Sequence, residues 1–217
     1  MIASAVFAFR GRAVMKLHQM HRSGNCYKVR LAARQLGMPI ALVDVDLAAG
    51  ETRSEAFRAK NPNGKVPVLE LADGRFLPES NAILWYLAEN SPLIPQDKFA
   101  RAEALQWMFF EQYSHEPYIA VARYWLTLAP KAELEKRRDK IPEWQKAGNA
   151  ALKVMDQHLA KRDWFAGPRY SVADIALYGY THVAGEGGFD LGHYPHVKRW
   201  LARVEAEPGF IPMAERW

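Results

Sequence analysis

Glu79 and Ser80 place a carboxylate and a hydroxyl side by side where the pattern of the chain predicts the start of a helix. The first backbone N–H groups of a helix have no partner within it, so they favour a negatively charged ligand. The two residues therefore offer an acceptor, a donor and unpaired N–H groups to a small molecule with a carboxylate. Pro67 adds a second feature at the start of a predicted strand. A cis bond there would be retained only if the backbone served a function.

The residues between these positions predict the elements that hold them. Two prolines and a glycine between 62 and 67 mark a loop. The apolar run at 66–71 predicts a strand, and Asp73-Gly74 is typical of a two-residue hairpin turn before a returning strand at 76–77. The segment is therefore expected to pass from loop to hairpin to helix.

Upstream elements complete a small sheet. Alternating polar and apolar residues predict a strand at 16–20, and apolar residues at helical spacing predict a helix that ends at Gly37. A strand at 40–45, a short helix at 52–60 and a helix at 80–89 follow. A helix that connects two consecutive strands makes them parallel, and the hairpin adds an antiparallel edge. A mixed sheet with helices on both faces is a thioredoxin-like architecture.

The second half of the chain has no strand pattern. Residues 98–128 predict a long helix that Pro117 should kink. Further helices are expected at 142–161 and near the C-terminus, where apolar residues recur at helical spacing. Four residues of the long helix share one stripe: Leu105, Met108, Phe109 and Gln112.

The expected fold class is therefore α/β plus all-α, with a thioredoxin-like N-terminal domain followed by an all-helical C-terminal domain. The first domain would span residues 16–89, a linker with two prolines 90–97, and the second domain 98–217. Residues 1–15 are expected to be an extension, either disordered or preceding the true start, because a second methionine stands at position 15. Their apolar part is too short for an export signal, and the basic residues follow it.

Ser171 and Asp174 predict the start of a core helix. A serine at the N-cap and an acid three residues later form a variant capping box, and Tyr170 and Ile175 could add a hydrophobic staple. This element is expected to serve folding and not chemistry.

Composition narrows the function. Hydrophobic residues make up 49% and charged residues 24%, as in globular proteins, and no apolar run approaches the roughly 18–20 residues that span a bilayer. The net charge is +5, but basic residues are spread along the chain, so neither nucleic acid nor membrane is an expected partner. The single Cys26 and the spacing of the histidines predict no disulfide, no metal site and a reducing compartment, the cytoplasm.

Three motifs together resemble the cytosolic glutathione transferases, in particular bacterial members of the serine-type or a related class. They are Gly-Lys-Val-Pro-Val-Leu at 64–69, Pro-Glu-Ser-Asn-Ala-Ile at 78–83 and Ser-Val-Ala-Asp-Ile-Ala at 171–176. The first looks like the family's cis-proline loop, the second like its Glu-Ser motif and the third like the N-cap box of its second domain. The resemblance covers nearly all of residues 16–217.

The resemblance implies that glutathione is the co-substrate and lies along the first domain. The backbone before the cis-proline would pair with the cysteinyl part of glutathione. The glutamate and the serine of the Glu-Ser motif would bind the γ-glutamyl ammonium and carboxylate, and a loop lysine would reach the glycyl carboxylate. The glutathione-binding residues implied in this way are Asn63, Lys65, Val66, Pro67, Glu79 and Ser80.

The turn between the first strand and the first helix would hold the group that activates the glutathione thiol. A free thiol has a pKa near 8.5, so only a few per cent is thiolate at neutral pH. In the serine-type members a hydroxyl after the first strand donates to the sulfur, and Ser23 fits that position. Asn25 is the rival as an amide donor. Cys26 would match members with a catalytic cysteine in this turn, although a structural role for it is preferred.

The second substrate would lie between the domains, against the kinked helix. Tyr113, Tyr118 and Arg123 are the candidate residues for binding it, with Arg123 available for an anionic group. The family's two-fold dimer, if retained, would bring Glu111, Gln112 or His115 near the partner's glutathione.

The resulting interpretation is a homodimeric glutathione transferase, in which the activated thiol attacks a small electrophile. Glutathione-dependent reduction of disulfides or peroxides, centred on Asn25 or Cys26, is the second enzymatic alternative. A non-catalytic interaction module with a transferase-like fold is the third. Isomerisation of the maleylacetoacetate type and dehalogenation stay open, since both use the same delivery of a thiol.

Overall fold

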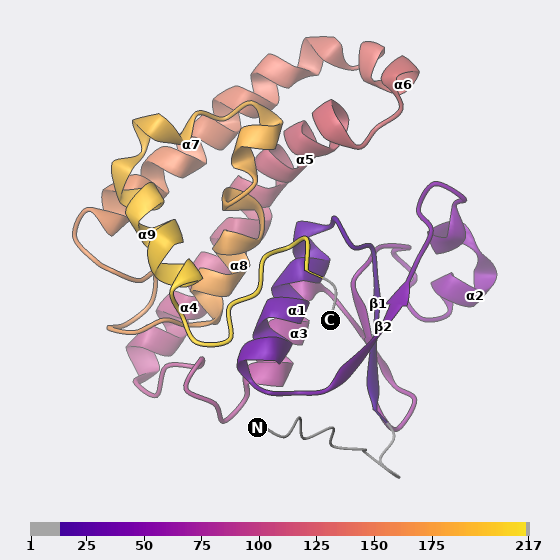
Figure 1. The fold of residues 1–217 in the computed structure, drawn as a ribbon, viewed down its shortest axis with the longest axis horizontal. Coiled ribbons are helices and arrows are strands. Elements are labelled where there is room, and N and C mark those ends of the chain that lie inside the picture. The colour runs from indigo at the N-terminus through magenta and orange to yellow at the C-terminus, as the bar shows by residue number, and fades with distance from the viewer. Residues whose placement is uncertain (1–13, 216–217) are drawn as a thin grey trace, which may run out of the picture.

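The computed structural model describes residues 14–215 (Figure 1). Most of the predicted extension at 1–15 lies outside the described residues. Its last residue, Met15, belongs to the first strand, so the sheet begins one residue earlier than expected.

The N-terminal part contains a four-stranded mixed sheet in the order β2-β1-β3-β4. β1 and β2 are parallel, because helix α1 (Gly24–Gln35) connects them, whereas β3 runs antiparallel to both β1 and β4. The strands are β1 (Met15–Gln19), β2 (Ile40–Asp44), β3 (Val68–Glu70) and β4 (Phe76–Pro78).

Helices cover both faces of this sheet, as the sequence predicts. α1 and α3 (Ser80–Ala88) lie on the face toward the helical part of the chain, and α2 (Glu55–Arg58), preceded by the 3-10 turn η1 (Glu51–Arg53), lies on the other side (Figure 1). Two separate apolar clusters follow from this. Leu17 and Leu69 pack with residues of α1 and α3, while Val68 packs with Phe57 of α2. Adjacent strand residues thus supply opposite faces.

The hairpin between β3 and β4 is longer than the predicted two-residue turn. Leu71 N–H bonds to Arg75 O (2.8 Å), and Gly74 N–H bonds to Leu71 O (3.0 Å), so three residues separate the paired positions. Gly74 has a φ of +85°, which glycine adopts without strain. The Asp-Gly pair therefore marks a type of turn in which the glycine completes a bulge.

The C-terminal part is entirely helical over the described residues (Figure 1). The fold class is therefore α/β plus all-α, as predicted, with a thioredoxin-like domain first. The longer helices are α4 (Lys98–Phe110), α5 (Glu116–Thr127), α7 (Ile141–Leu159), α8 (Val172–Thr181) and α9 (Pro195–Glu205), joined by α6 (Lys131–Glu135) and the 3-10 turns η3 (Arg138–Lys140), η4 (Ala184–Gly187) and η5 (Leu191–His193).

A π-helical turn, η2 (Glu111–His115), interrupts the long helix expected at 98–128. Pro117 is the second residue of α5, and its ring would clash with the carbonyl of residue 113 in a continuous α-helix. A π turn widens the backbone at that point and gives the ring room. The interruption therefore lies just before Pro117, and it changes the direction in which later side chains point.

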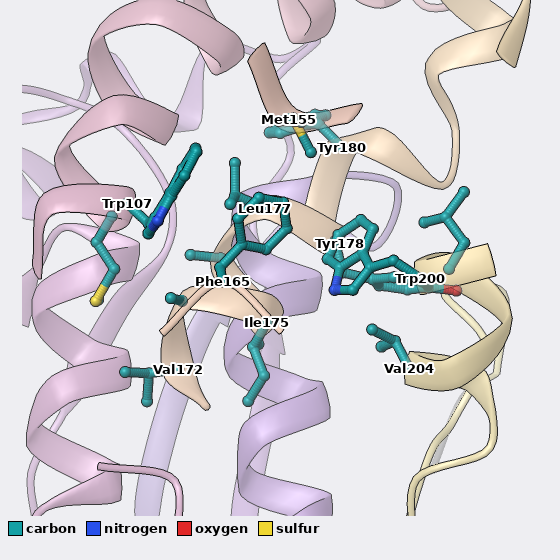
Figure 2. Packing of buried hydrophobic residues seen from close by; sticks show 14 of the residues in the cluster. Trp107, Met155, Phe165, Val172, Ile175, Leu177, Tyr178, Tyr180, Trp200 and Val204 are labelled. Carbon is teal, nitrogen blue, oxygen red and sulfur yellow. The ribbon is translucent and has the colours of Figure 1, made fainter. Parts of the chain in front are cut away.

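Helix α8 forms the centre of the helical core, and all ten of its residues are buried. Its own Tyr178 packs in a row of aromatic rings with Trp200, Phe165 and Trp107, in tilted and edge-to-face pairs with centroids 4.7–6.1 Å apart (Figure 2). Because α1 and α3 also pack on α8, this helix belongs to the contact between the two domains.

The predicted capping box at the start of α8 is present. Ser171 N–H and Oγ both bond to Asp174 Oδ2, at 2.9 and 3.0 Å. The other carboxyl oxygen accepts from Trp200 Nε1 (2.9 Å) and from Phe165 N–H (3.2 Å). The buried Asp174 therefore connects the cap to α9 and to the loop before α8.

Replacement of Ser171 by Ala should lower the free energy of unfolding by about 1 kcal/mol or more. The substitution removes the cap of a fully buried helix and one donor to Asp174. Urea denaturation measures this loss, and Ser54→Ala, at the N-cap of the short peripheral α2, serves as a matched control that should cost less. Equal losses for the two variants would contradict the central role of α8.

Candidate functional site

Two adjoining cavities lie at the boundary between the sheet and α5. We call the smaller, of about 80 Å³, the inner pocket, and the larger, of about 320 Å³, the outer cleft. Asn25, Lys65 and Val66 line both, so the two cavities adjoin. The inner pocket is completed by Asn61, Pro67, Glu79, Ser80, Gln112 and Glu116. The outer cleft is completed by Met20, Arg22, Ser23, Leu47, Thr52, Arg53, Gly64, Ala120, Arg123, Tyr124, Leu128 and Tyr180.

The inner pocket contains the loop and the helix start that the sequence singles out. The Val66–Pro67 peptide bond is cis, as predicted. Ser80 begins α3 and is buried, and Glu79 before it has a φ of +70°, a region that non-glycine residues rarely adopt. Such strained residues cluster at binding sites, because the surrounding structure must hold them in place.

Asn61, and not the predicted Asn63, reaches the inner pocket. Asn61 is buried, and its side-chain N–H bonds to Lys65 O at 2.8 Å, which braces the loop before the cis-proline. Asn63 is exposed, and its backbone N–H bonds back to Asn61 Oδ1. The two asparagines frame one tight turn, so their side chains point in different directions.

Ser23 lies at the end of the outer cleft, between β1 and α1. It is the N-cap of α1, where its Oγ accepts from Cys26 N–H at 3.3 Å. The same hydroxyl lies near the thiol of Cys26 and the phenol of Tyr180. Since a hydroxyl accepts with its lone pairs and donates with its hydrogen, capping leaves that hydrogen available to a group in the cleft.

Asn25 lies where the two cavities meet. Its Oδ1 accepts from Lys28 Nζ at 2.8 Å and from Ser80 Oγ at 3.3 Å, and its Nδ2 donates to Glu116 Oε1 at 3.2 Å. One amide thus joins the first turn of α1, the start of α3 and the start of α5. Burial raises the pKa of the Glu116 carboxyl.

Cys26 is buried beneath the turn instead of facing the cavities. Its side chain is 0% exposed, and its sulfur accepts from Met20 N–H. Burial raises the pKa of the Cys26 thiol to about 11, and the nearby Ser23 hydroxyl offsets only part of that effect. A nucleophilic cysteine needs access and a low pKa, so this geometry contradicts a catalytic Cys26.

Tyr113 and Tyr118, the predicted electrophile-binding tyrosines, line neither cavity. Tyr113 is 86% exposed, because η2 turns it toward solvent. Tyr118 follows the π turn, and the face of α5 toward the cavities carries Glu116, Ala120 and Tyr124 instead. The extra backbone length of a π turn shifts the side-chain direction of every later residue.

Arg123 does line the outer cleft, but its guanidinium is already paired. Nε donates to Glu186 at 2.9 Å, and Nη1 donates to Arg22 O at 2.8 Å. The side chain is 3% exposed, so Arg123 ties α5 to the turn before α1. This geometry contradicts the expected role as a free cation for an anionic substrate. Arg53 and Lys65, both exposed, are the cations on the other wall.

Tyr180 is the most informative residue that the sequence did not indicate. It lies in α8, is buried, and contacts Ser23 on the floor of the outer cleft. The desolvation of its phenol raises its pKa well above the usual range, so it stays protonated. No local pattern connects it with Ser23, because the contact forms only when the two domains pack together.

Within the described residues, no group of three or more His, Cys, Asp and Glu side chains is arranged to hold a metal ion. No helix among residues 14–215 combines the length and apolar composition needed to cross a bilayer.

Comparison with known protein families shows to which family the chain belongs. Residues 17–96 match the model of the glutathione S-transferase N-terminal domain, and residues 101–208 match that of its C-terminal domain. A crystal structure of a glutathione S-transferase from Pseudomonas fluorescens Pf-5 is 51% identical and superimposes with a TM-score of 0.89 over 93% of this chain and all of that one. The chain therefore belongs to the cytosolic glutathione transferase family.

Two further relatives bear on the ligand and the reaction. A glutathione transferase from Burkholderia graminis, 30% identical with a TM-score of 0.77 over 91% of this chain and 85% of that one, was crystallised with two glutathione molecules bound per subunit. A relative with this fold therefore binds glutathione. The disulfide-bond oxidoreductase YfcG of Escherichia coli strain K12 is 30% identical over 85% of this chain and 87% of its own length. Family membership therefore leaves the reaction type open.

His115 makes the fold sensitive to acid. Its Nε2 must donate to Thr181 Oγ1 (2.9 Å), because the Thr181 hydroxyl itself donates to Leu177 O. Burial, aided by the nearby Lys28, lowers the pKa of His115 to about 3. The unfolded chain, with a pKa near 6.5, binds a proton that the folded chain does not, so stability falls as the pH drops below about 6.5.

The expected loss from His115 is about 2 kcal/mol at pH 5, since each pH unit contributes about 1.4 kcal/mol. Urea denaturation at pH 7 and pH 5 measures it. His115→Gln keeps an N–H donor for Thr181 and cannot titrate, so this variant should lose less stability between the two pH values than the wild type. If His115→Gln lost as much stability between pH 7 and pH 5 as the wild type, His115 would not be the source of the acid sensitivity.

Proposed function

We propose that the protein is a glutathione transferase that activates the glutathione thiol for attack on an electrophile. The observation that carries the proposal is that the two cavities adjoin and share three lining residues, with the Ser23 hydroxyl in one and the helix start at Ser80 in the other. A tripeptide that spans both cavities could have its γ-glutamyl end in the inner pocket and its sulfur near the turn before α1.

The residues of the inner pocket suit the γ-glutamyl end of glutathione. Ser80 offers its hydroxyl and the N–H groups of α3 to the carboxylate, and Glu79 offers a carboxylate to the ammonium. The backbone of Val66, before the cis bond, is open to the cysteinyl part. Lys65 and Arg53, at the other end, supply positive charge for the glycyl carboxylate.

The chemical step requires that the thiol lose its proton near neutral pH. One hydrogen bond from Ser23 to the sulfur anion, together with the N-terminal field of α1, contributes energy of the order needed to lower the pKa by about two units. The thiolate then attacks an electrophile held in the outer cleft beside Tyr124 and Leu128. Both groups are held in place before reaction, which adds an orientation effect.

Ser23→Ala should raise the pKa of bound glutathione by about one unit or more, because it removes a donor to the anion. The ultraviolet absorbance of the thiolate, followed against pH, measures the shift, and conjugation of an aryl halide at pH 6.5 should slow by about tenfold. Ser23→Thr retains both the hydroxyl and the cap and should restore most of the rate. An unchanged thiol pKa in Ser23→Ala would eliminate Ser23 as the donor.

Glutathione-dependent disulfide reduction is the second candidate, and the relation to an oxidoreductase favours it. Since Cys26 is buried, such a reaction would use the sulfurs of glutathione and of the substrate alone. Cys26→Ser should then leave a disulfide-reductase assay unchanged while Asn25→Ala lowers it. Failure of the wild type to bind glutathione resin would instead favour the interaction module.

An apolar groove on α3 and α4 supports the proposed homodimer. It is lined by the stripe predicted on the long helix together with Trp85 and Tyr86, and its volume is about 680 Å³. Phe109 is 71% and Tyr86 44% exposed in the single chain. Apolar side chains gathered in this way mark an interface, and a second copy would cover them.

Phe109→Asp should convert the dimer to a monomer, because a charge buried in a two-fold interface meets its own copy. Size-exclusion chromatography with light scattering measures the mass. Phe99→Asp is the matched control: Phe99 is 70% exposed in the same helix but lies outside the groove. A monomeric wild type, or two variants that behave alike, would contradict the proposed interface.

A further inference from the structure

Lys28 is a buried cation beside the candidate site. Its side chain and that of Glu111 are both 0% exposed, and Lys28 Nζ lies 2.7 Å from Glu111 Oε1. The same ammonium donates to Asn25 Oδ1 at 2.8 Å. Lys28 belongs to α1 and Glu111 to η2, so the ion pair joins the two domains one helical turn beyond Asn25.

The shape of the surrounding structure is specific for this lysine. The aliphatic part of Lys28 passes over Gly179 of α8, where a Cβ would lie 2.7 Å from Lys28 Cγ. The ammonium lies 5.9 Å from the centre of the Tyr180 ring. A side chain at position 179 would displace Lys28, so the absence of a Cβ there makes room for the extended lysine.

The pair is fully bonded on the carboxylate side as well. Glu111 Oε2 accepts from Asn81 Nδ2 at 3.1 Å and from Gln112 Nε2 at 2.8 Å. Buried ion pairs add little net stability, because the loss of hydration offsets most of the attraction. Well-packed apolar residues would serve the fold about as well. Apolar residues, however, could not determine the orientation of a neighbouring polar group.

The group so oriented is the amide of Asn25. An ammonium has only N–H donors, so the amide oxygen must face Lys28, and Ser80 Oγ lies on the same side. The amide nitrogen then faces Glu116 and the space where the inner pocket and the outer cleft meet. It carries two hydrogens, of which Glu116 accepts one, and the second can be donated to a group bound in that space.

We propose that Lys28 and Glu111 are positioning residues that hold the Asn25 amide with its N–H groups toward the cavities, where Asn25 donates to the glutathione sulfur beside Ser23. The inference rests on the proposed function. Without the ammonium, the amide can rotate by half a turn and present its oxygen to the anion, which would repel it. The pair therefore acts on the thiol through Asn25 and touches no substrate itself.

The test replaces both members of the pair, since removal of one would leave an unpaired buried charge. Lys28→Met/Glu111→Gln removes both charges, replaces the lysine by an unbranched side chain one atom shorter, and keeps the length of Glu111 and an acceptor for Asn81. It should raise the pKa of bound glutathione by roughly one unit, a tenfold loss of thiolate at neutral pH. Asn25→Ala should give a similar shift, and the triple variant should add little to either. Lys65, Glu79 and Glu116, the charged groups that line the inner pocket, are unchanged in every variant.

Binding of glutathione and cooperative unfolding are measured on each variant, so that misfolding is recognised. A folded Lys28→Met/Glu111→Gln protein that binds glutathione with a wild-type thiol pKa would overturn the proposal. The proposal would also be overturned if the shift in thiol pKa of the triple variant equalled the sum of the shifts in the pair variant and in Asn25→Ala. The proposed function fails separately, if the wild type neither binds glutathione nor lowers its thiol pKa. A shift in Ser23→Ala without one in the pair variant would leave the transferase function intact and reject only this inference.

Discussion

The close approach of α1 to α8 is the constraint on which the site depends. A Cβ on Gly24 would lie 2.5 Å from the carbonyl oxygen of Gly179, and the two helices could not pack as they do with larger residues at these positions. This contact determines where the first domain sits on the second. Ser23, at the start of α1, meets Tyr180 of α8 only because no side chain separates the helices.

Local signals in the sequence were sufficient for the parts of the site that one segment builds. The helix start at Ser80 and the capping box at Ser171 follow from residues within a few positions of one another, and the cis bond before Pro67 was implied by the resemblance of the motif at 64–69 to a known family. The parallel pairing of β1 and β2 was equally predictable, because a single helix connects them. Such features depend on backbone geometry, and the residue types that permit that geometry are few.

Two kinds of feature were not predictable from local signals: the direction of side chains beyond an irregular helical turn, and contacts between residues far apart in the sequence. Extrapolation of the helical period from α4 into α5 assigns Tyr118 to the wrong face, because η2 inserts a wider turn between them. Arg123 was expected to be free, and its partner Glu186 comes from a distant part of the chain. The burial of Cys26 likewise results from packing and not from its position in the first turn of α1.

The burial of Cys26 has a consequence for an enzyme that handles electrophiles. A protein that binds alkylating or arylating compounds risks modification of its own sulfur, and this chain has a single cysteine. Cys26 lies one residue from Asn25 but has no exposed surface, and its raised pKa keeps it as the unreactive thiol. Under the proposed transferase function, an electrophile bound in the outer cleft would therefore meet no exposed protein cysteine that it could modify.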